Sequence, residues 1–159
     1  MKEKLLLLKS EILDDRQRLV RLMDRFQTVW DLYSKEKDYS LLVEAAFTVN
    51  QIYTGCERIF RNIASTFENS IDENLWHRAL LDRMRLEIED VRPALLSESS
   101  FNHLNELLAF RHYFRHAYDS DIREDKFKIV ASSTLELREL LLDDIKNYID
   151  FVDKLITAS

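Results

Sequence analysis

The chain has 159 residues, enough for one domain with a substantial core, and it contains a single glycine and a single proline. A sheet fold would need many tight turns built on residues with positive φ, which this composition does not provide. Charged residues make up 33% and hydrophobic residues 46%, the usage of amphipathic helices, so we expect an all-α protein. The net charge of −6 argues against broad, non-specific binding to nucleic acid but is compatible with a small basic site.

Two features of the chain bear on its location. No stretch approaches the roughly 18 apolar residues that a membrane span requires, and the apolar run of residues 5–8 is cut short by Lys9, unlike a signal peptide. The single cysteine, Cys56, has no partner for an internal disulfide and lies in an apolar helical pattern, which favours a buried structural thiol. We therefore expect a cytoplasmic, soluble protein that does not contact a membrane.

The first half of the chain predicts two long helices. Apolar residues recur at spacings of three and four over residues 4–33 and again over residues 41–67. The charged stretch between them, residues 34–40, is a connector in which Asp38 or Ser40 caps the second helix. Gly55 lies in the middle of that helix, where it costs stability relative to alanine, and so indicates close packing against another helix.

The second half predicts three more helices. The third covers residues 72–87 and ends before Pro93, because a residue that precedes proline is disfavoured in helical conformation. The fourth covers residues 101–117, with Ser100 as its cap, and the fifth covers residues 123–156. We see no linker or internal repeat, so residues 1–159 are expected to form a single domain of about five helices with a four-helix bundle core.

The fourth expected helix carries the residues with the clearest chemical meaning. Residues 110–118 read Phe-Arg-His-Tyr-Phe-Arg-His-Ala-Tyr and hold two of the four histidines together with Arg111 and Arg115. A guanidinium presents fixed donors to phosphate oxygens and stays charged, whereas an imidazole titrates near neutrality. Cleavage of RNA without a metal needs these two properties, one group to move protons and another to stabilise charge on the phosphorus-centred transition state.

This segment resembles a known family. Arg111 and His116 fit the motif Arg-x4–6-His of HEPN ribonucleases, and Tyr118 extends it to the Arg-x4-His-x-Tyr form of HepT-like toxins. The Trp-His-Arg of residues 76–78 and the Val-Arg-Pro-Ala of residues 91–94 also look like that family, so the similarity covers most of the chain. The short motif alone would be unspecific. The indication comes from the added tyrosine and from the position of the motif before a long final helix.

The resemblance implies an HEPN-like helical bundle and a metal-independent endoribonuclease that is the toxin of a type VII-like toxin–antitoxin pair. Arg111 and His116 would be catalytic, and Arg115 and His112 would be further contacts to phosphate or RNA. The partner would be a minimal nucleotidyltransferase antitoxin, which silences the toxin by adenylylation of Tyr118. A bulky anion beside the catalytic pair would block RNA and neutralise the phosphate-binding charge. No cofactor, metal or DNA is expected.

Helical geometry predicts how the site is assembled. At about 100° per residue, Arg111, Arg115 and Tyr118 lie along one stripe, while His116 is about 140° from Arg111. One ideal helix does not easily bring both groups onto the same phosphate. Either the helix is distorted near His116, or two copies meet and share the site. HEPN ribonucleases are generally dimers whose motifs face each other, so we expect a homodimer.

Other readings of the same residues remain open. His112 and His116 have the four-residue spacing of a helical metal pair, although no carboxylate at a useful spacing completes a site. Arg111 and Arg115 would have a structural role if they pair with Glu106 and Asp119. His77 and His103 are expected to be surface or packing residues. A different class of function, a non-catalytic HEPN module that holds a nucleotidyltransferase or another protein, is favoured by the acidic net charge.

Overall fold

The computed structural model describes residues 1–68, 77–116 and 121–159, and within them it contains five helices and no strand. The long helices are α1 (Lys2–Glu36), α2 (Tyr39–Phe67) and α5 (Glu124–Ala158), and the shorter ones are α3 (His77–Met84) and α4 (Glu98–His116). The expected all-α class and the approximate positions of the helices are confirmed. Tyr118, Trp76 and the expected start of the third helix at residue 72 lie outside the described residues.

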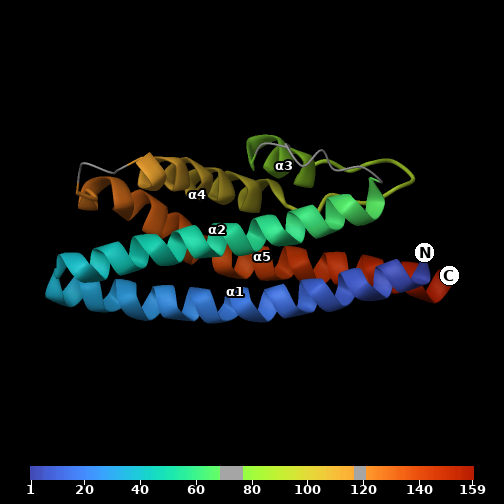
Figure 1. Cartoon of the computed structure of the whole chain (residues 1–159), viewed down its shortest axis with the longest axis horizontal. Coiled ribbons are helices and arrows are strands. Elements are labelled where there is room, and N and C mark those ends of the chain that lie inside the picture. Colours follow the sequence, from blue (N-terminus) through green and yellow to red (C-terminus); the bar gives the residue numbers. More distant parts are fainter. Residues whose placement is uncertain (69–76, 117–120) are drawn as a thin grey trace.

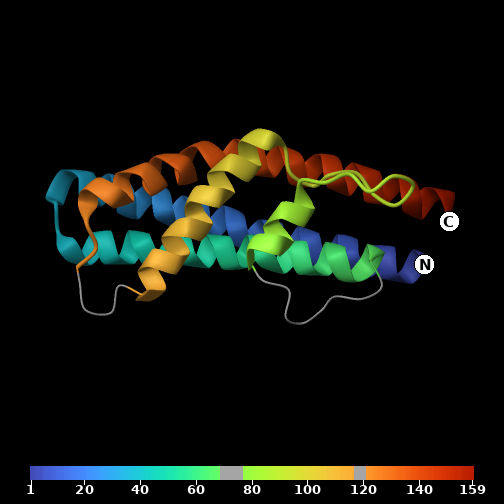
Figure 2. The same ribbon diagram turned by 90° about the horizontal axis from the view of Figure 1, so that it is seen from above.

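Four of the helices, α1, α2, α4 and α5, form the bundle, and α3 adds Leu80, Leu81 and Met84 to its core. α1 and α2 run antiparallel along the whole molecule with α5 beside α1, and both termini lie at the same end (Figure 1). α4 packs on α5 and α2 and crosses them obliquely, as Figure 2 shows from above. Each of these helices contributes to one continuous set of buried apolar side chains, among them Leu19, Phe26, Tyr53, Phe60, Leu104, Phe110, Phe127 and Tyr148. The expected four-helix core is therefore α1, α2, α4 and α5.

The turn between α1 and α2 is shorter than the sequence indicated. Only two residues separate the helices: Lys37, in the left-handed conformation with φ of 54°, and Asp38, the N-cap of α2. The amide of Lys37 donates to the carbonyl of Tyr33 at 2.8 Å, which closes α1, and the carboxylate of Asp38 accepts from the amide of Ser40 at 2.9 Å. Of the two expected caps, Asp38 is therefore the one used, and Ser40 lies inside the helix.

Close packing between α1 and α2 explains the single glycine. A Cβ atom added at Gly55 would lie 2.9 Å from Cδ2 of Leu19, so a side chain there would require the leucine side chain to move or the helices to separate. The neighbouring Cys56 is fully buried, and burial raises the pKa of its thiol from 9.0 to about 12. Both expectations, close helix packing at Gly55 and a structural thiol at Cys56, are confirmed.

Two boundaries in the second half of the chain differ from the prediction. α3 ends at Met84 and not at residue 87, because the carbonyl of Met84 accepts from the amides of Leu95 and Leu96 at 2.9 and 3.1 Å instead of continuing the helix. α4 begins at Glu98, and its cap is Ser97, whose hydroxyl oxygen accepts from the amide of Ser100 at 3.2 Å. The prediction that Ser100 caps this helix is therefore wrong.

Within the described ranges, no helix combines the length and the apolar character that crossing a bilayer would require.

Candidate functional site

The last two turns of α4 place the motif side chains on the outside of the core. Phe110 is buried and lies against Phe127 of α5, with ring centroids 5.2 Å apart. It continues the buried positions Phe101, Leu104 and Leu107 at three-residue spacing, so this face of α4 is fixed against the bundle. Arg111 therefore points along the flank of the helix and is half-buried, whereas Arg115 and His116 are exposed.

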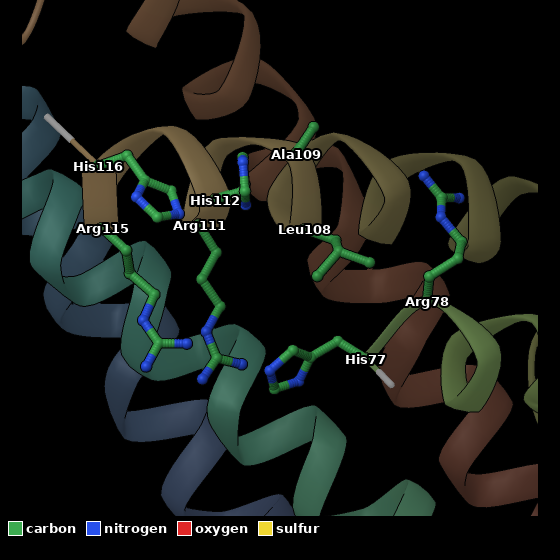
Figure 3. A pocket seen from close by; sticks show the side chains of 8 residues that line it. All are labelled: His77, Arg78, Leu108, Ala109, Arg111, His112, Arg115 and His116. Atoms are coloured by element: carbon green, nitrogen blue, oxygen red, sulfur yellow. The ribbon is translucent and has the colours of Figure 1, made fainter. Parts of the chain in front are cut away.

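A cavity of about 720 Å³ opens beside α4 and α3. Its walls carry Leu108 and Ala109 and six side chains that are cationic or become cationic on protonation: Arg78, Arg111, Arg115, His77, His112 and His116. Figure 3 shows the side chains of Arg111, Arg115 and His77 converging from the two helices. A concentration of positive charge in an acidic protein favours an anionic ligand such as a phosphate group.

Arg111 lies against Tyr53 and Glu57 of α2, and two of its nitrogens have no hydrogen-bond partner among the described residues. Its guanidinium carbon lies 5.7 Å from the ring centre of the buried Tyr53, and Nη1 is 3.8 Å from Oε2 of Glu57. Its side chain is only 13% exposed, yet no acceptor among the described residues lies within hydrogen-bonding distance of Nε or Nη1. Both nitrogens are also shielded from solvent, so a ligand in the cavity meets the remaining part of the guanidinium, whose positive charge favours an anionic group.

Glu57 joins three helices at the edge of this cavity. The carboxylate comes from α2, its Oε2 lies 2.5 Å from Nδ1 of His77 on α3, and Arg111 on α4 approaches the same oxygen. Arg61, one turn further along α2, is 3.6 Å from the other carboxylate oxygen, Oε1. Because Glu57 is itself only 7% exposed, the two arginines and the hydrogen bond to His77 offset the cost of burying its charge.

The structure brings four of the predicted site residues together. Arg111, His112, Arg115 and His116 all line the same cavity, and the ring centres of His112 and His116 are 4.5 Å apart. The expected angular separation of Arg111 and His116 on the helix does not keep them from a common cavity, because both side chains reach its walls. Tyr118, the expected acceptor of adenylylation, lies outside the described residues.

The structure corrects one part of the alternative in which the arginines of α4 only form ion pairs. The acidic neighbour of Arg111 is Glu57 of α2 and not Glu106 of its own helix. Asp119 lies outside the described residues, and within the described residues Arg115 has no ion pair. His103 is a packing residue as expected, with Nδ1 3.2 Å from the hydroxyl of Ser133 and Nε2 3.3 Å from Glu136.

Sequence reasoning missed three residues at this site: Glu57, His77 and Tyr53. His77 lies in the cavity wall, 34 positions before Arg111, and no local pattern connects the two. Glu57 could have been found, since it follows Tyr53 by four residues and precedes Phe60 by three, on the apolar face of α2. A charged residue at such a position indicates a buried ionic partner.

Comparison with known proteins gives one match. A family model described as HepT-like protein matches residues 44–152, which includes most of α2 and α5, the whole of α3 and α4, and both Arg111 and His116. No curated protein and no solved structure is significantly similar to the chain.

Proposed function

The chain belongs to the HepT-like family, and from this premise we propose that it is a metal-independent endoribonuclease with Arg111 and His116 as its catalytic pair. The observation that carries the proposal is the Arg111 guanidinium in the wall of a cavity that His116 and further basic side chains also line. A phosphodiester group supplies anionic oxygens for these side chains. Family membership supports an HEPN-type protein, and the cavity supports the choice of RNA backbone as ligand.

The chemistry follows from the two side chains. The 2′-hydroxyl oxygen of the substrate attacks the adjacent phosphorus, the bond from phosphorus to the 5′-oxygen breaks, and a 2′,3′-cyclic phosphate and a 5′-hydroxyl result. Arg111 stabilises the additional negative charge on the phosphoryl oxygens, and Glu57 and Tyr53 restrict its motion from behind. His116, exposed at the described end of α4, transfers a proton to or from a reacting oxygen.

Purified wild type and His116→Ala, incubated with total RNA and EDTA, test this proposal. We expect wild type to yield fragments with 2′,3′-cyclic phosphate ends and His116→Ala to yield none. His103→Ala is the matched control, because His103 lies on the same helix but outside the cavity, and it should cleave like wild type. Cleavage that requires a divalent ion, or that is equal in wild type and His116→Ala, would contradict the proposal.

We further propose that the chain is the toxin of a toxin–antitoxin pair and that a minimal nucleotidyltransferase silences it by adenylylation of Tyr118. Tyr118 follows His116 by two residues, so the added phosphate is close in sequence to the catalytic pair. With a cognate nucleotidyltransferase and ATP, intact-mass spectrometry should show added AMP on wild type and none on Tyr118→Phe. Tyr118→Phe should remain an active nuclease that escapes silencing.

A homodimer is the proposed assembly, with the motif-bearing ends of two α4 helices facing one cleft. Light scattering at micromolar concentration should give twice the mass of the chain. The contrasting function, a non-catalytic module that holds a partner protein, is supported by the net charge of −6. It predicts a stable complex with the nucleotidyltransferase and no cleavage by the free chain.

A further inference from the structure

Within the described part of the chain, His77 is the one histidine of the cavity that comes from α3 and the one that is hydrogen-bonded to a carboxylate. Its Nδ1 lies 2.5 Å from Oε2 of Glu57, and its side chain is 38% exposed while that of Glu57 is 10% exposed. The carboxylate is thus almost buried behind an imidazole that solvent reaches. Figure 3 shows the ring of His77 directed across the cavity toward the guanidinium of Arg111.

This pairing defines what the imidazole can do. A carboxylate accepts a hydrogen bond from Nδ1–H, which leaves the lone pair of the neutral ring on Nε2. The same carboxylate stabilises the imidazolium that forms when Nε2 takes up a proton, and it fixes the plane of the ring. A histidine held in this way is suited to act as a general base.

We propose that His77 is the general base of the RNA cleavage reaction, with Glu57 as its positioning residue and His116 as the general acid; this rests on the proposed function. Nε2 of His77 takes the proton from the 2′-hydroxyl as the bond from the 2′-oxygen to phosphorus forms. His116 gives its proton to the 5′-oxygen as the bond from phosphorus to that oxygen breaks. His77 ends protonated and His116 neutral, and exchange with solvent restores both.

The assignment places the two proton transfers on different helices of one chain. Among the described residues, the charged and titratable groups around His77 are Glu57 and Arg61 from α2, Arg78 beside it on α3, and Arg111, His112, Arg115 and His116 from α4. Of these, Glu57 is the one acidic group in direct contact with His77. The proton acceptor is therefore in direct contact with a carboxylate, from which Arg111 stays 3.8 Å away, and the guanidinium of Arg111 lines the cavity where the phosphate binds.

The first experiment compares His77→Asn with His103→Asn. An asparagine amide can still donate to Glu57 from about the position of Nδ1, but it has no group at the position of Nε2. We expect His77→Asn to lower kcat by roughly 10²–10⁴-fold and to lose the acidic limb of the rate–pH profile, because that limb reports the base. His103, which also contacts a carboxylate but lies outside the cavity, should show neither change.

The second experiment separates the base from the acid. In a short RNA whose leaving 5′-oxygen is replaced by sulfur, the thiolate departs without protonation. This substrate should restore cleavage by His116→Ala and should not restore cleavage by His77→Asn. Glu57→Gln retains a hydrogen-bonding partner for Nδ1 but not the charge, so we expect kcat to fall while KM changes little.

The outcomes distinguish this inference from the proposed function. Wild-type kinetics in His77→Asn, with His116→Ala inactive, would overturn the role of His77 and leave the nuclease standing. Sulfur rescue of His77→Asn instead of His116→Ala would overturn the assignment of base and acid. A wild type that cleaves no RNA would overturn the proposed function and this inference together.

Discussion

Glu57 of α2 and Glu68, the residue that follows the last residue of α2, each bind basic side chains from later parts of the chain. The two clusters differ in whether the arginine donors are bound to the protein. The glutamates are eleven residues apart, which at about 100° per residue places their backbone positions within about 20° of each other around the axis of α2. The Glu68 cluster consists of Glu68, Arg83 and Arg92, and the Glu57 cluster consists of Glu57, His77 and Arg111.

In the Glu68 cluster the donors of the buried arginine are bound to protein. The side chain of Arg92 is 0% exposed, and its guanidinium donates to Oε1 of Glu68 at 2.8 Å and to the carbonyls of Arg83, Leu86 and Pro93 at 3.2–3.3 Å. These bonds tie the end of α2 to α3 and to the turn that follows it. An arginine with its donors bound in this way stabilises the fold and has nothing to offer a ligand.

In the Glu57 cluster the arginine lies 3.8 Å from its carboxylate, too far for a hydrogen bond, and Nε and Nη1 have no acceptor among the described residues. The cluster also borders a cavity of about 720 Å³, whereas Arg92 does not line it. Arg92 is fully buried and its donors are bound to the protein, whereas Arg111 is 13% exposed and lines a cavity. This difference separates a structural ion pair from a candidate ligand site.

The largest effect on stability is expected for Arg92→Ala. The substitution leaves Glu68 with one cation fewer and leaves three backbone carbonyls without their donor, so it should lower the free energy of unfolding by about 3–5 kcal/mol. Denaturant titration followed by circular dichroism measures this. A change below about 1 kcal/mol would show that the Glu68 cluster is not what ties α3 to α2.

Arg111→Ala should have the opposite profile. Its donors bond little in the protein, so we expect a loss of about 1 kcal/mol of stability, together with a roughly 10²–10³-fold loss of RNA cleavage. Arg111→Lys retains the charge without the forked donors and should recover only part of the activity. Equal stability losses in Arg111→Ala and Arg92→Ala would remove the distinction between the clusters.

Binding of inorganic phosphate gives a smaller effect that requires no RNA. At several times its dissociation constant, phosphate should stabilise the wild type by about 1 kcal/mol relative to chloride at equal ionic strength. Arg111→Ala should lose this stabilisation. Arg83→Ala, which removes a cation from the Glu68 cluster instead, should keep it, although its starting stability is lower. Thermal melts of the three proteins provide the measurement.

The smallest effects concern two buried tyrosines, Tyr53 near Arg111 and Tyr148 near Arg92, whose hydroxyls have no partner within the described residues. Burial raises the pKa of both hydroxyls above the ordinary value of 10.0, so the folded state holds their protons more tightly than the unfolded state does. This preference does not reduce the free energy of unfolding below pH 10, but above pH 10 the unfolded state ionises first and the free energy of unfolding falls as pH rises. At pH 8 each Tyr→Phe variant should be within about 1 kcal/mol of wild type.

Above pH 10 each variant should lose less stability than wild type, by up to about 1.4 kcal/mol per pH unit. Urea titrations at pH 8 and pH 10.5 compare them. Because both hydroxyls are buried and have no hydrogen-bond partner within the described residues, the two variants should behave alike. A difference confined to Tyr53 would show that the clusters differ in more than their arginine donors.

The long helices could be predicted because their apolar spacing extends over many turns. The roles of Gly55, Cys56 and Asp38 could also be predicted, because each follows from the residue type and its place in a helical pattern. The end of α3 could not be predicted, since the amides of Leu95 and Leu96 that bind its last carbonyl come from eleven and twelve residues further along the chain. The motif on α4 could be found by its pattern. The position of Glu57 on the apolar face of α2 also indicates a buried partner, but the identity of that partner could not be predicted, because Glu57 and His77 meet only after α2 and α3 have packed.

The absence of a side chain at Gly55 has a consequence that extends beyond the α1–α2 interface. Tyr53 and Glu57 lie two residues before and two residues after it, and both contact Arg111 from beneath. The side chain of Leu19 on α1 occupies the space that a Cβ atom at Gly55 would need. An alanine here therefore requires Leu19 to move, and where the leucine does not move far enough, α2 shifts and takes Tyr53 and Glu57 with it. Gly55→Ala is thus expected to alter the surroundings of Arg111 as well as the interface between the two helices.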